Sequence, residues 1–300
     1  MPKIEYVSKK FNTNTYQLIL QANEIIEEYQ SQGYSLTLRQ LYYQFVARDI
    51  IPNKQTEYKR LGSVINDARL AGMIDWYAIE DRTRNLASLP HWDGPQDIVE
   101  SCSTQFRYDM WEDQRCRVEV WVEKEALAGV FSRVCTELDI PYFSCRGYVS
   151  QSEMWVAAQR LQKYIEDGQW ALILHFGDHD PSGIDMTRDI RDRLSTFWAD
   201  SVEVRRIALN MDQIDEHSPP PNPAKVTDSR FRGYCARYGD DSWELDALEP
   251  AVLAGLVRQE VSELVDEEKW DARAKLQEEG RKDLKLVAKK WPKVLEAIRH

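Results

Sequence analysis

Three acidic side chains follow strands that the sequence predicts. Glu123 closes the strand of residues 117–123, and Asp178 and Asp180 come directly after the apolar strand of residues 170–176. Because ligands of parallel sheets gather at the carboxyl ends of the strands, we expect these carboxylates to lie close together. Mg²⁺ prefers such oxygen ligands, usually one or two carboxylates with waters and phosphate oxygens. The pattern favours a Mg²⁺ site that would neutralise charge on a phosphate.

Simpler interpretations of the two aspartates remain open. An acid after a strand often begins a turn, and Asp180 before a proline and a serine fits the start of a helix. The string DHDPSG also partly matches a calcium-binding loop. We reject the calcium interpretation because the twelfth position is Asp189 rather than glutamate and because a buried strand, not a helix, precedes the loop.

Two further glutamates compete with Glu123 as a ligand. Glu119 lies on the same face of the strand but farther from its end, because side chains alternate between faces. Glu125 already falls in the helix that follows. We therefore expect Glu123 to be the ligand, with Glu125 as the second choice.

A tyrosine pair supplies a candidate nucleophile. Thr37 is a plausible N-cap for a helix over residues 38–49, in which Tyr42 belongs to the apolar stripe and should be buried. Tyr43 lies about 100° around the helix, on the face of Arg39. A phenol with a pKa near 10 is a poor nucleophile, but a guanidinium favours the phenolate and can hold a phosphate. Tyr43 could therefore attack a phosphate, or it could be an amphipathic tyrosine at a domain contact.

The elements around this pair suggest a small N-terminal domain. Helices are expected over residues 14–31, 38–49 and 55–71, followed by a strand over 73–84 with a basic rim. Three helices and a strand are the plan of a winged helix, and a small helical cap on the next domain is the alternative. The basic residues expected to contact DNA phosphates are Lys59, Arg60, Arg69, Arg82 and Arg84.

The remaining chain divides into three parts. Residues 86–116 resemble a linker with some local structure, and residues 117–208 alternate strand and helix. This order predicts a mostly parallel sheet with helices on both faces, so the expected fold class is α/β plus α. Residues 211–245 are irregular, with a cluster of basic and aromatic residues over 225–243, and the chain from 247 onward is expected to be helical. The domain boundaries predicted are 1–85, 86–116, 117–210 and 211–300.

Composition limits the possible classes of protein. The 300 residues include 43% hydrophobic residues, and no apolar run approaches the length of a membrane span. Five cysteines without a CxxC pair argue against a zinc site or a disulfide scaffold and favour a reducing cytoplasm. The net charge of −11 disfavours a non-specific nucleic-acid coat. Residues 1–84, however, carry 11 basic and 10 acidic residues, so they are the better place for DNA.

Taken together, these motifs resemble a known family. The glutamate followed by D-x-D at strand ends resembles the Toprim fold of topoisomerases, primases and related nucleases. A winged helix with R-x-x-YY before such a domain is similar to the A subunit of topoisomerase VI and to the meiotic double-strand-break transesterase. The resemblance covers about residues 35–210 and includes the GYVSQSE segment at 147–153. Solitary Mini-A relatives of phages and mobile elements are closest in size, although His179 stands where the family often has glycine.

The resemblance implies a DNA-cleaving transesterase. Tyr43 would attack a backbone phosphate and leave a 5′-phosphotyrosyl link, while Arg39 binds that phosphate. Mg²⁺ on Glu123, Asp178 and Asp180 would stabilise the transition state. The family acts as a homodimer, with the tyrosine of one chain meeting the metal of the other, and full topoisomerase activity needs a separate ATPase B subunit.

Two other functions fit the same residues. The chain could bind double-stranded DNA through its N-terminal domain without cutting it. It could also be a Toprim nuclease in which the N-terminal domain serves only for specificity. Replacement of Tyr43 by phenylalanine distinguishes them, because hydrolysis would survive this change and transesterification would not.

Overall fold

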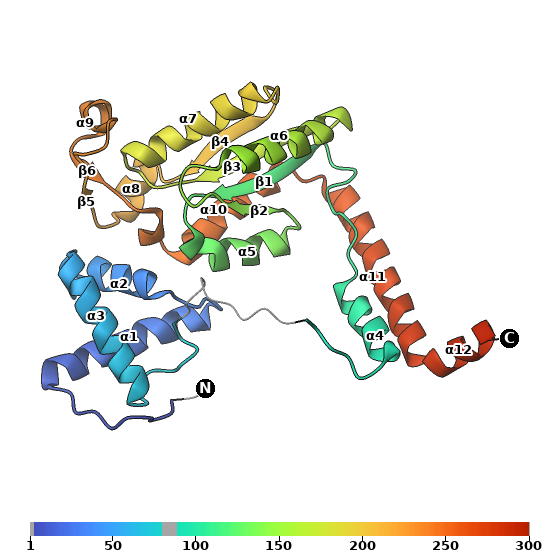
Figure 1. The fold of residues 1–300 in the computed structure, drawn as a ribbon, viewed down its shortest axis with the longest axis horizontal. Coiled ribbons are helices and arrows are strands. Elements are labelled where there is room, and N and C mark those ends of the chain that lie inside the picture. Colours follow the sequence, from blue (N-terminus) through green and yellow to red (C-terminus); the bar gives the residue numbers. More distant parts are fainter. Residues whose placement is uncertain (1–2, 80–88, 300) are drawn as a thin grey trace.

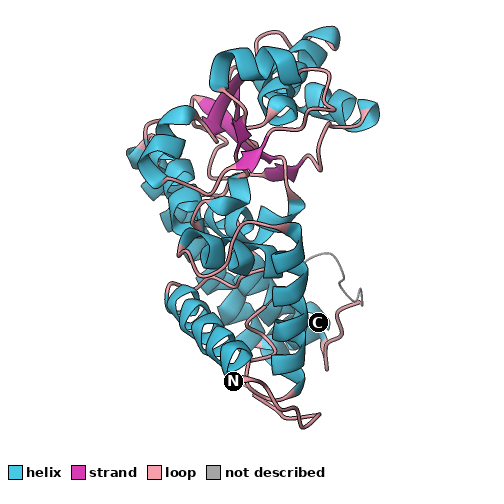
Figure 2. Cartoon of the chain, turned by 90° about the vertical axis from the view of Figure 1, so that its left-hand side faces the viewer, coloured by secondary structure: helices cyan, strands magenta, loops and turns pink. Residues whose placement is uncertain are grey.

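A parallel sheet organises the larger part of the chain. The computed structural model describes residues 3–79 and 89–299, and over these ranges the chain is an α/β protein with 12 α-helices (Figure 1). The strands are β1 Cys116–Val122, β2 Tyr142–Ser144, β3 Trp170–Phe176 and β4 Glu203–Ala208. Figure 2 shows that these strands occupy one part of a molecule that is otherwise mostly helical. The α/β class and the alternation predicted for residues 117–208 are confirmed.

The strand order explains where a ligand would bind. The order in the sheet is β2-β1-β3-β4, and all neighbours are parallel. The chain moves from β1 to β2 on one side, and from β3 to β4 on the other. The winding therefore reverses between β1 and β3, and in such sheets ligands bind outside the carboxyl ends of these two strands.

Helices cover both faces of the sheet because its strands are apolar on both faces. Val118, Val120 and Val122 of β1 pack on one pair of helices, whereas Trp121 packs on the other pair. The pairs are α5 Ala128–Glu137 with α10 Pro250–Ser262, and α6 Gln151–Glu166 with α7 Pro181–Thr196. Such continuous burial is typical of parallel strands.

Three helices form the N-terminal part of the molecule. They are α1 Thr13–Ser31, α2 Leu38–Ala47 and α3 Gln55–Leu70, and they enclose a separate apolar core. Thr37 caps α2 as predicted: its side chain accepts a hydrogen bond from the Gln40 backbone, and the Gln40 side chain accepts one from the Thr37 backbone. This capping box fixes the start of the helix that carries the tyrosine pair.

The strand predicted for residues 73–84 is wrong over its described part. Residues 73–79 form turns, with a single bridge between Leu36 and Ile79. Asp75 causes the turn, because its side chain accepts a hydrogen bond from the Tyr77 backbone. Arg69 also holds the turn, since its guanidinium donates to the Trp76 carbonyl.

The N-terminal helices dock on the sheet domain through α2. The short helix η2 Leu245–Ala247 lies against α2, and Ala247 joins the N-terminal core. Asn53 adds hydrogen bonds to the carbonyl of Pro221 and to the side chain of Asn222. The elements between β4 and η2 are α8 Met211–His217, β5 Asn222–Pro223, α9 Phe231–Tyr238 and β6 Asp241–Ser242.

The expected linker and the C-terminal region pack together as a projecting arm. The segment 86–116 contains α4 Pro95–Gln105, which lies beside α11 Glu267–Lys289 (Figure 1). Arg281 donates to the Phe106 carbonyl at 2.9 Å, and α12 Trp291–Arg299 follows at the tip. The helical C-terminus is therefore confirmed. Within the described ranges, none of the helices combines the length and the apolar character that a membrane span requires.

Candidate functional site

Glu123 and Asp178 meet at the reversal point of the sheet. Glu123 follows β1 directly, and Asp178 stands two residues after β3. The Asp178 backbone N–H donates to Glu123 Oε2 at 2.8 Å. Gly183 at the start of α7 permits the close approach of this helix to Asp178, since a Cβ there would lie 2.2 Å from the Asp178 carbonyl oxygen. The two strand ends therefore lie together, and the binding of a metal ion by their carboxylates stays a prediction. We call this pair the sheet side of the site.

The two carboxyl groups of the sheet side are poorly neutralised. Burial, followed by the neighbouring charge of Asp178, raises the pKa of Glu123 to about 8. Burial also raises the pKa of Asp178 to about 6, although Lys124 opposes this shift. Both shifts mean that a second negative charge is costly at this position unless a cation joins it.

Asp180 is occupied differently from the other two predicted ligands. It is the N-cap of α7, and its Oδ1 accepts hydrogen bonds from the Gly183 backbone at 2.6 Å and from the Ser182 hydroxyl at 2.9 Å. Its other oxygen lies 3.9 Å from Lys225 Nζ. Asp180 therefore caps α7, as in the simpler interpretation of this residue.

Lys124 links the sheet side to a second group of charges. Its Nζ lies 2.9 Å from Asp178 Oδ2, 2.9 Å from Glu244 Oε2 and 3.0 Å from Asp246 Oδ1. Arg39 of α2 also pairs with Glu244 and with Asp246, and its Nε lies 3.1 Å from Asp246 Oδ2. We call Arg39, Tyr43, Lys124, Glu244 and Asp246 the helix side of the site.

Tyr43 is buried within the helix side, which fits the alternative of a tyrosine at a domain contact. Only 4% of its surface is exposed, as for Tyr42, because η2 covers this face of α2. Its hydroxyl lies within the electrostatic influence of the Glu244 carboxylate. Burial, then Glu244 and Asp246, raise the pKa of Tyr43 above its ordinary value, and Arg39 offsets this only in part. Arg39 thus favours the phenolate, as expected, but burial and the two acids outweigh it.

A cavity nevertheless reaches the tyrosine pair. It has a volume of about 310 Å³ and lies between α2, the start of α3 and the segments that carry Asn222 and Glu244. Arg39, Tyr42 and Tyr43 line one wall, and Lys54 lines another. The cavity thus joins basic and phenolic groups, the combination that suits an anion.

The oxygen donors of the sheet side fit Mg²⁺ as a two-carboxylate site. Their raised pKa values mean that the charged forms are disfavoured, and a divalent cation would favour these forms. Among residues 3–79 and 89–299, however, no three acidic, histidine or cysteine side chains are arranged to hold one ion together. Mg²⁺ with two carboxylates would complete its shell with waters and phosphate oxygens.

The residues predicted to contact DNA lie in different settings. Lys59 and Arg60 are exposed on α3, and Arg60 pairs with Glu57 at 2.7 Å. Arg69 is taken up by the turn after α3, and its guanidinium stacks on Trp76 with 4.8 Å between the guanidinium carbon and the ring. Arg82 and Arg84 lie outside the described residues.

Sequence reasoning missed Lys124, Glu244 and Asp246. Lys124 had a signal, because it follows Glu123 at the same strand end. The two acids had none, since they stand in an irregular segment far along the chain. Of the competing glutamates, Glu119 is buried and paired with Arg160 at 2.7 Å, and Glu125 pairs with Arg146. Neither therefore replaces Glu123.

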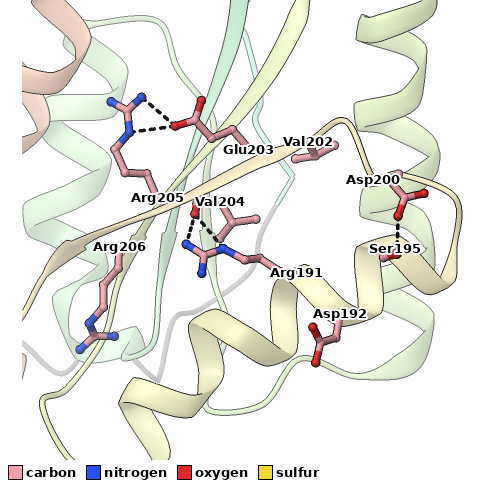
Figure 3. Close-up of a pocket in the computed structure, with 10 residues that line it drawn as sticks. Arg191, Asp192, Ser195, Asp200, Val202, Glu203, Val204, Arg205 and Arg206 are labelled. Carbon is pink, nitrogen blue, oxygen red and sulfur yellow. Dashed lines mark hydrogen bonds and ion pairs between the residues drawn. The ribbon is translucent and has the colours of Figure 1, made fainter.

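A second, more open hollow of about 950 Å³ lies beside the edge strand β4 (Figure 3). Its arginines are already engaged. Arg191 donates to the Val204 carbonyl, and Arg205 pairs with Glu203 at 2.8 Å. The chemistry is therefore better sought at the carboxyl edge of the sheet, where Glu123 and Asp178 meet.

Comparison with known proteins does not identify the chain. No protein-family model matches its sequence, and no curated protein matches it. The function must therefore be argued from the residues themselves.

Proposed function

We propose that the chain is a DNA-binding protein of the topoisomerase VI A-subunit kind, with a winged-helix and a Toprim domain, and that it cuts DNA by Mg²⁺-dependent tyrosine transesterification. The observation that carries this proposal is the junction of its two halves within one chain, whereas in the family that it resembles the tyrosine of one chain meets the metal of the other. Arg39 and Tyr43 on α2 meet Glu244, and Lys124 joins Glu244 to Asp178 on the carboxyl edge of the sheet. The tyrosine motif on α2 and the acids at the strand ends, which are about 80 residues or more apart in sequence, thus belong to one polar network.

Each part of the network has a role in this chemistry. Arg39 and Lys124 would bind the phosphate that is attacked, because a guanidinium and an ammonium both pair with its oxygens. The Tyr43 oxygen would form a bond to phosphorus and lose its proton. The bond from phosphorus to the 3′ oxygen would break, and that oxygen would take up a proton as it leaves.

Glu123 and Asp178 would hold the cation. When bound there, Mg²⁺ would neutralise the charge that develops on the phosphate and on the leaving oxygen. We also propose that the chain binds double-stranded DNA as a homodimer and that an ATPase B subunit would be a separate partner. Lys59 and Arg60, both exposed on α3, would add contacts to the DNA backbone.

The burial of Tyr43 favours a second candidate function. A phenol that is 4% exposed, with its pKa raised by burial and by Glu244, is not ready to attack in this conformation. A chain that stays in this conformation would bind DNA without cleaving it. The two functions share the DNA site and differ only in whether Tyr43 becomes accessible.

An SDS-trapped cleavage assay on supercoiled plasmid tests the proposal. The chain is incubated with Mg²⁺ or Mn²⁺, and protein-linked breaks are compared between the wild type, Tyr43→Phe and Tyr42→Phe. Tyr42→Phe is the matched control, since it removes a neighbouring buried hydroxyl that bonds to Asn53 and Lys54 rather than to Glu244. We expect protein-linked breaks in the wild type and the control and none in Tyr43→Phe.

Each other outcome selects a different function. Breaks that persist in Tyr43→Phe without attached protein would indicate a Toprim nuclease. Plasmid binding without breaks in any variant would indicate the non-cleaving DNA-binding protein. If the chain neither binds nor breaks the plasmid, both proposals are contradicted.

A further inference from the structure

Glu244 occupies an unusual position between three groups that could bind an anion. Its carboxylate pairs with Arg39 and with Lys124, at 2.9 Å from the ammonium, and lines the same cavity as Tyr43, whose pKa it raises. Burial raises its pKa, but the two cations outweigh burial and hold the pKa at about 2. The carboxylate is therefore an anion in a site built from two cations and a phenol.

The other acid of the helix side has a different character. The side chain of Asp246 is completely buried, at 0% exposure, and it lies in η2 beneath the same two cations. The side chain of Glu244 keeps 25% exposure and lines the cavity at the tyrosine pair. Glu244 is thus the acid that can turn into solvent, whereas Asp246 stays in place.

The backbone around Glu244 allows such a movement. Glu244 is extended, with φ −92° and ψ 137°, and it connects the two-residue strand β6 to the three-residue helix η2. Its side chain extends from this connection to Arg39 and Lys124. A change of its χ angles alone would therefore move the carboxylate away from both cations. Neither Arg39 on α2 nor Lys124 at the end of β1 would need to move.

We propose that the position of the Glu244 carboxylate is a binding site for a phosphate group, which Glu244 covers in the free protein. A phosphate oxygen replaces the carboxylate between Arg39 and Lys124, and the Tyr43 hydroxyl then lies next to the phosphate. This inference deepens the proposed function and rests on it for the source of the phosphate, which is the DNA backbone. Asp246 and Asp178 keep the cations in place while Glu244 is displaced.

The inference predicts that loss of the Glu244 charge opens the site to phosphate. The test measures thermal stabilisation by inorganic phosphate at constant ionic strength for the wild type, Glu244→Gln and Glu263→Gln. Glu263 is the matched control because its exposed side chain at the carboxyl end of α10 gives the same change of net charge. We expect Glu244→Gln to bind phosphate about tenfold more tightly than the wild type or the control.

A double variant checks that the gain belongs to this site. Arg39→Gln together with Glu244→Gln removes one of the two cations, and we expect the gain in phosphate affinity to disappear. If Glu244→Gln does not fold alone, folding in phosphate but not in chloride supports the inference, and failure to fold in both overturns it. A phosphate response of Glu244→Gln that equals that of Glu263→Gln also overturns it.

A duplex DNA arm separates this inference from the proposed function. Glu244→Gln should bind a short duplex more tightly than Glu263→Gln does. Tighter phosphate binding by Glu244→Gln without duplex binding in any variant would support the phosphate site and contradict the DNA function. Duplex binding by all variants, with no preference for Glu244→Gln in either arm, would leave the DNA function standing and overturn the inference.

Discussion

The sheet side and the helix side differ in how their acids are compensated. On the sheet side, Glu123 and Asp178 lie together, and their pKa values are raised to about 8 and about 6. On the helix side, Lys124 and Arg39 outweigh the burial of Glu244 and hold its pKa at about 2. Of the three acids that contact Lys124, the buried Asp178 and Asp246 have raised pKa values, whereas the pKa of the partly exposed Glu244 is lowered. This difference suits the sheet side to bind a cation and the helix side to exchange the Glu244 carboxylate for another anion.

Lys124 contacts acids on both sides, so its substitution should have the largest effect on the free energy of unfolding. Lys124→Ala would leave Asp178 and the buried Asp246 with less compensation. We expect the free energy of unfolding to fall by about 3–5 kcal/mol, as when one partner of a buried ion pair is removed. Urea denaturation measures this change.

An exposed lysine provides the control for this prediction. Lys282 on α11 lies 3.9 Å from Glu278 and is well exposed. Lys282→Ala should alter the free energy of unfolding by no more than about 0.5 kcal/mol. Equal effects of the two substitutions would show that the helix side does not depend on its central cation.

The raised pKa of Glu123 gives the sheet side a pH dependence. Between the ordinary pKa of a glutamate and about 8, the folded chain binds more protons at this position than the unfolded chain. The free energy of unfolding therefore falls as the pH rises, by on the order of 2 kcal/mol between about pH 5 and about pH 8 without divalent cations. Urea denaturation at several pH values, with a chelator present, measures this slope.

Substitution of Glu123 should remove most of the slope. Glu123→Gln keeps the shape of the side chain and has no proton to lose, so most of the slope between about pH 6 and about pH 8 should disappear, while Asp178 still contributes below about pH 6. Glu125→Gln, which changes a glutamate paired with Arg146 instead, should retain the wild-type slope. A slope that persists in Glu123→Gln above about pH 6 would assign the pH dependence to other groups.

The smallest effect concerns the placement of the helix side. Thr37→Ala removes the side-chain acceptor of the capping box at the start of α2. We expect a loss of about 1 kcal/mol in the free energy of unfolding, while Thr37→Ser should retain most of the stability. Because α2 carries Arg39 and Tyr43, the alanine variant should weaken the helix side without changing the pH slope of the sheet side.

The sequence predicted the sheet side better than the helix side, for a physical reason. Glu123 and Asp178 follow strands whose hydrophobic pattern is local, and parallel strands bring their ends together whatever the rest of the chain does. The cap at Thr37 is local in the same way.

The helix side depends on a contact that no local pattern encodes. Tyr43 lies off the apolar stripe of α2, but η2 returns from residues 245–247 to cover it. The partners Glu244 and Asp246 therefore could not be found from α2. The strand expected after α3 does not form over residues 73–79, because Asp75 turns the chain there.

The most direct test of the two-sided account is duplex DNA binding at constant ionic strength, with and without Mg²⁺. Fluorescence anisotropy would compare the wild type, Glu123→Gln and Glu125→Gln. The account predicts that Mg²⁺ tightens DNA binding by the wild type and Glu125→Gln and has no such effect on Glu123→Gln. DNA affinity that is unaffected by Mg²⁺ in the wild type, or equally raised in Glu123→Gln, would contradict a site in which a cation on the sheet side meets a phosphate on the helix side.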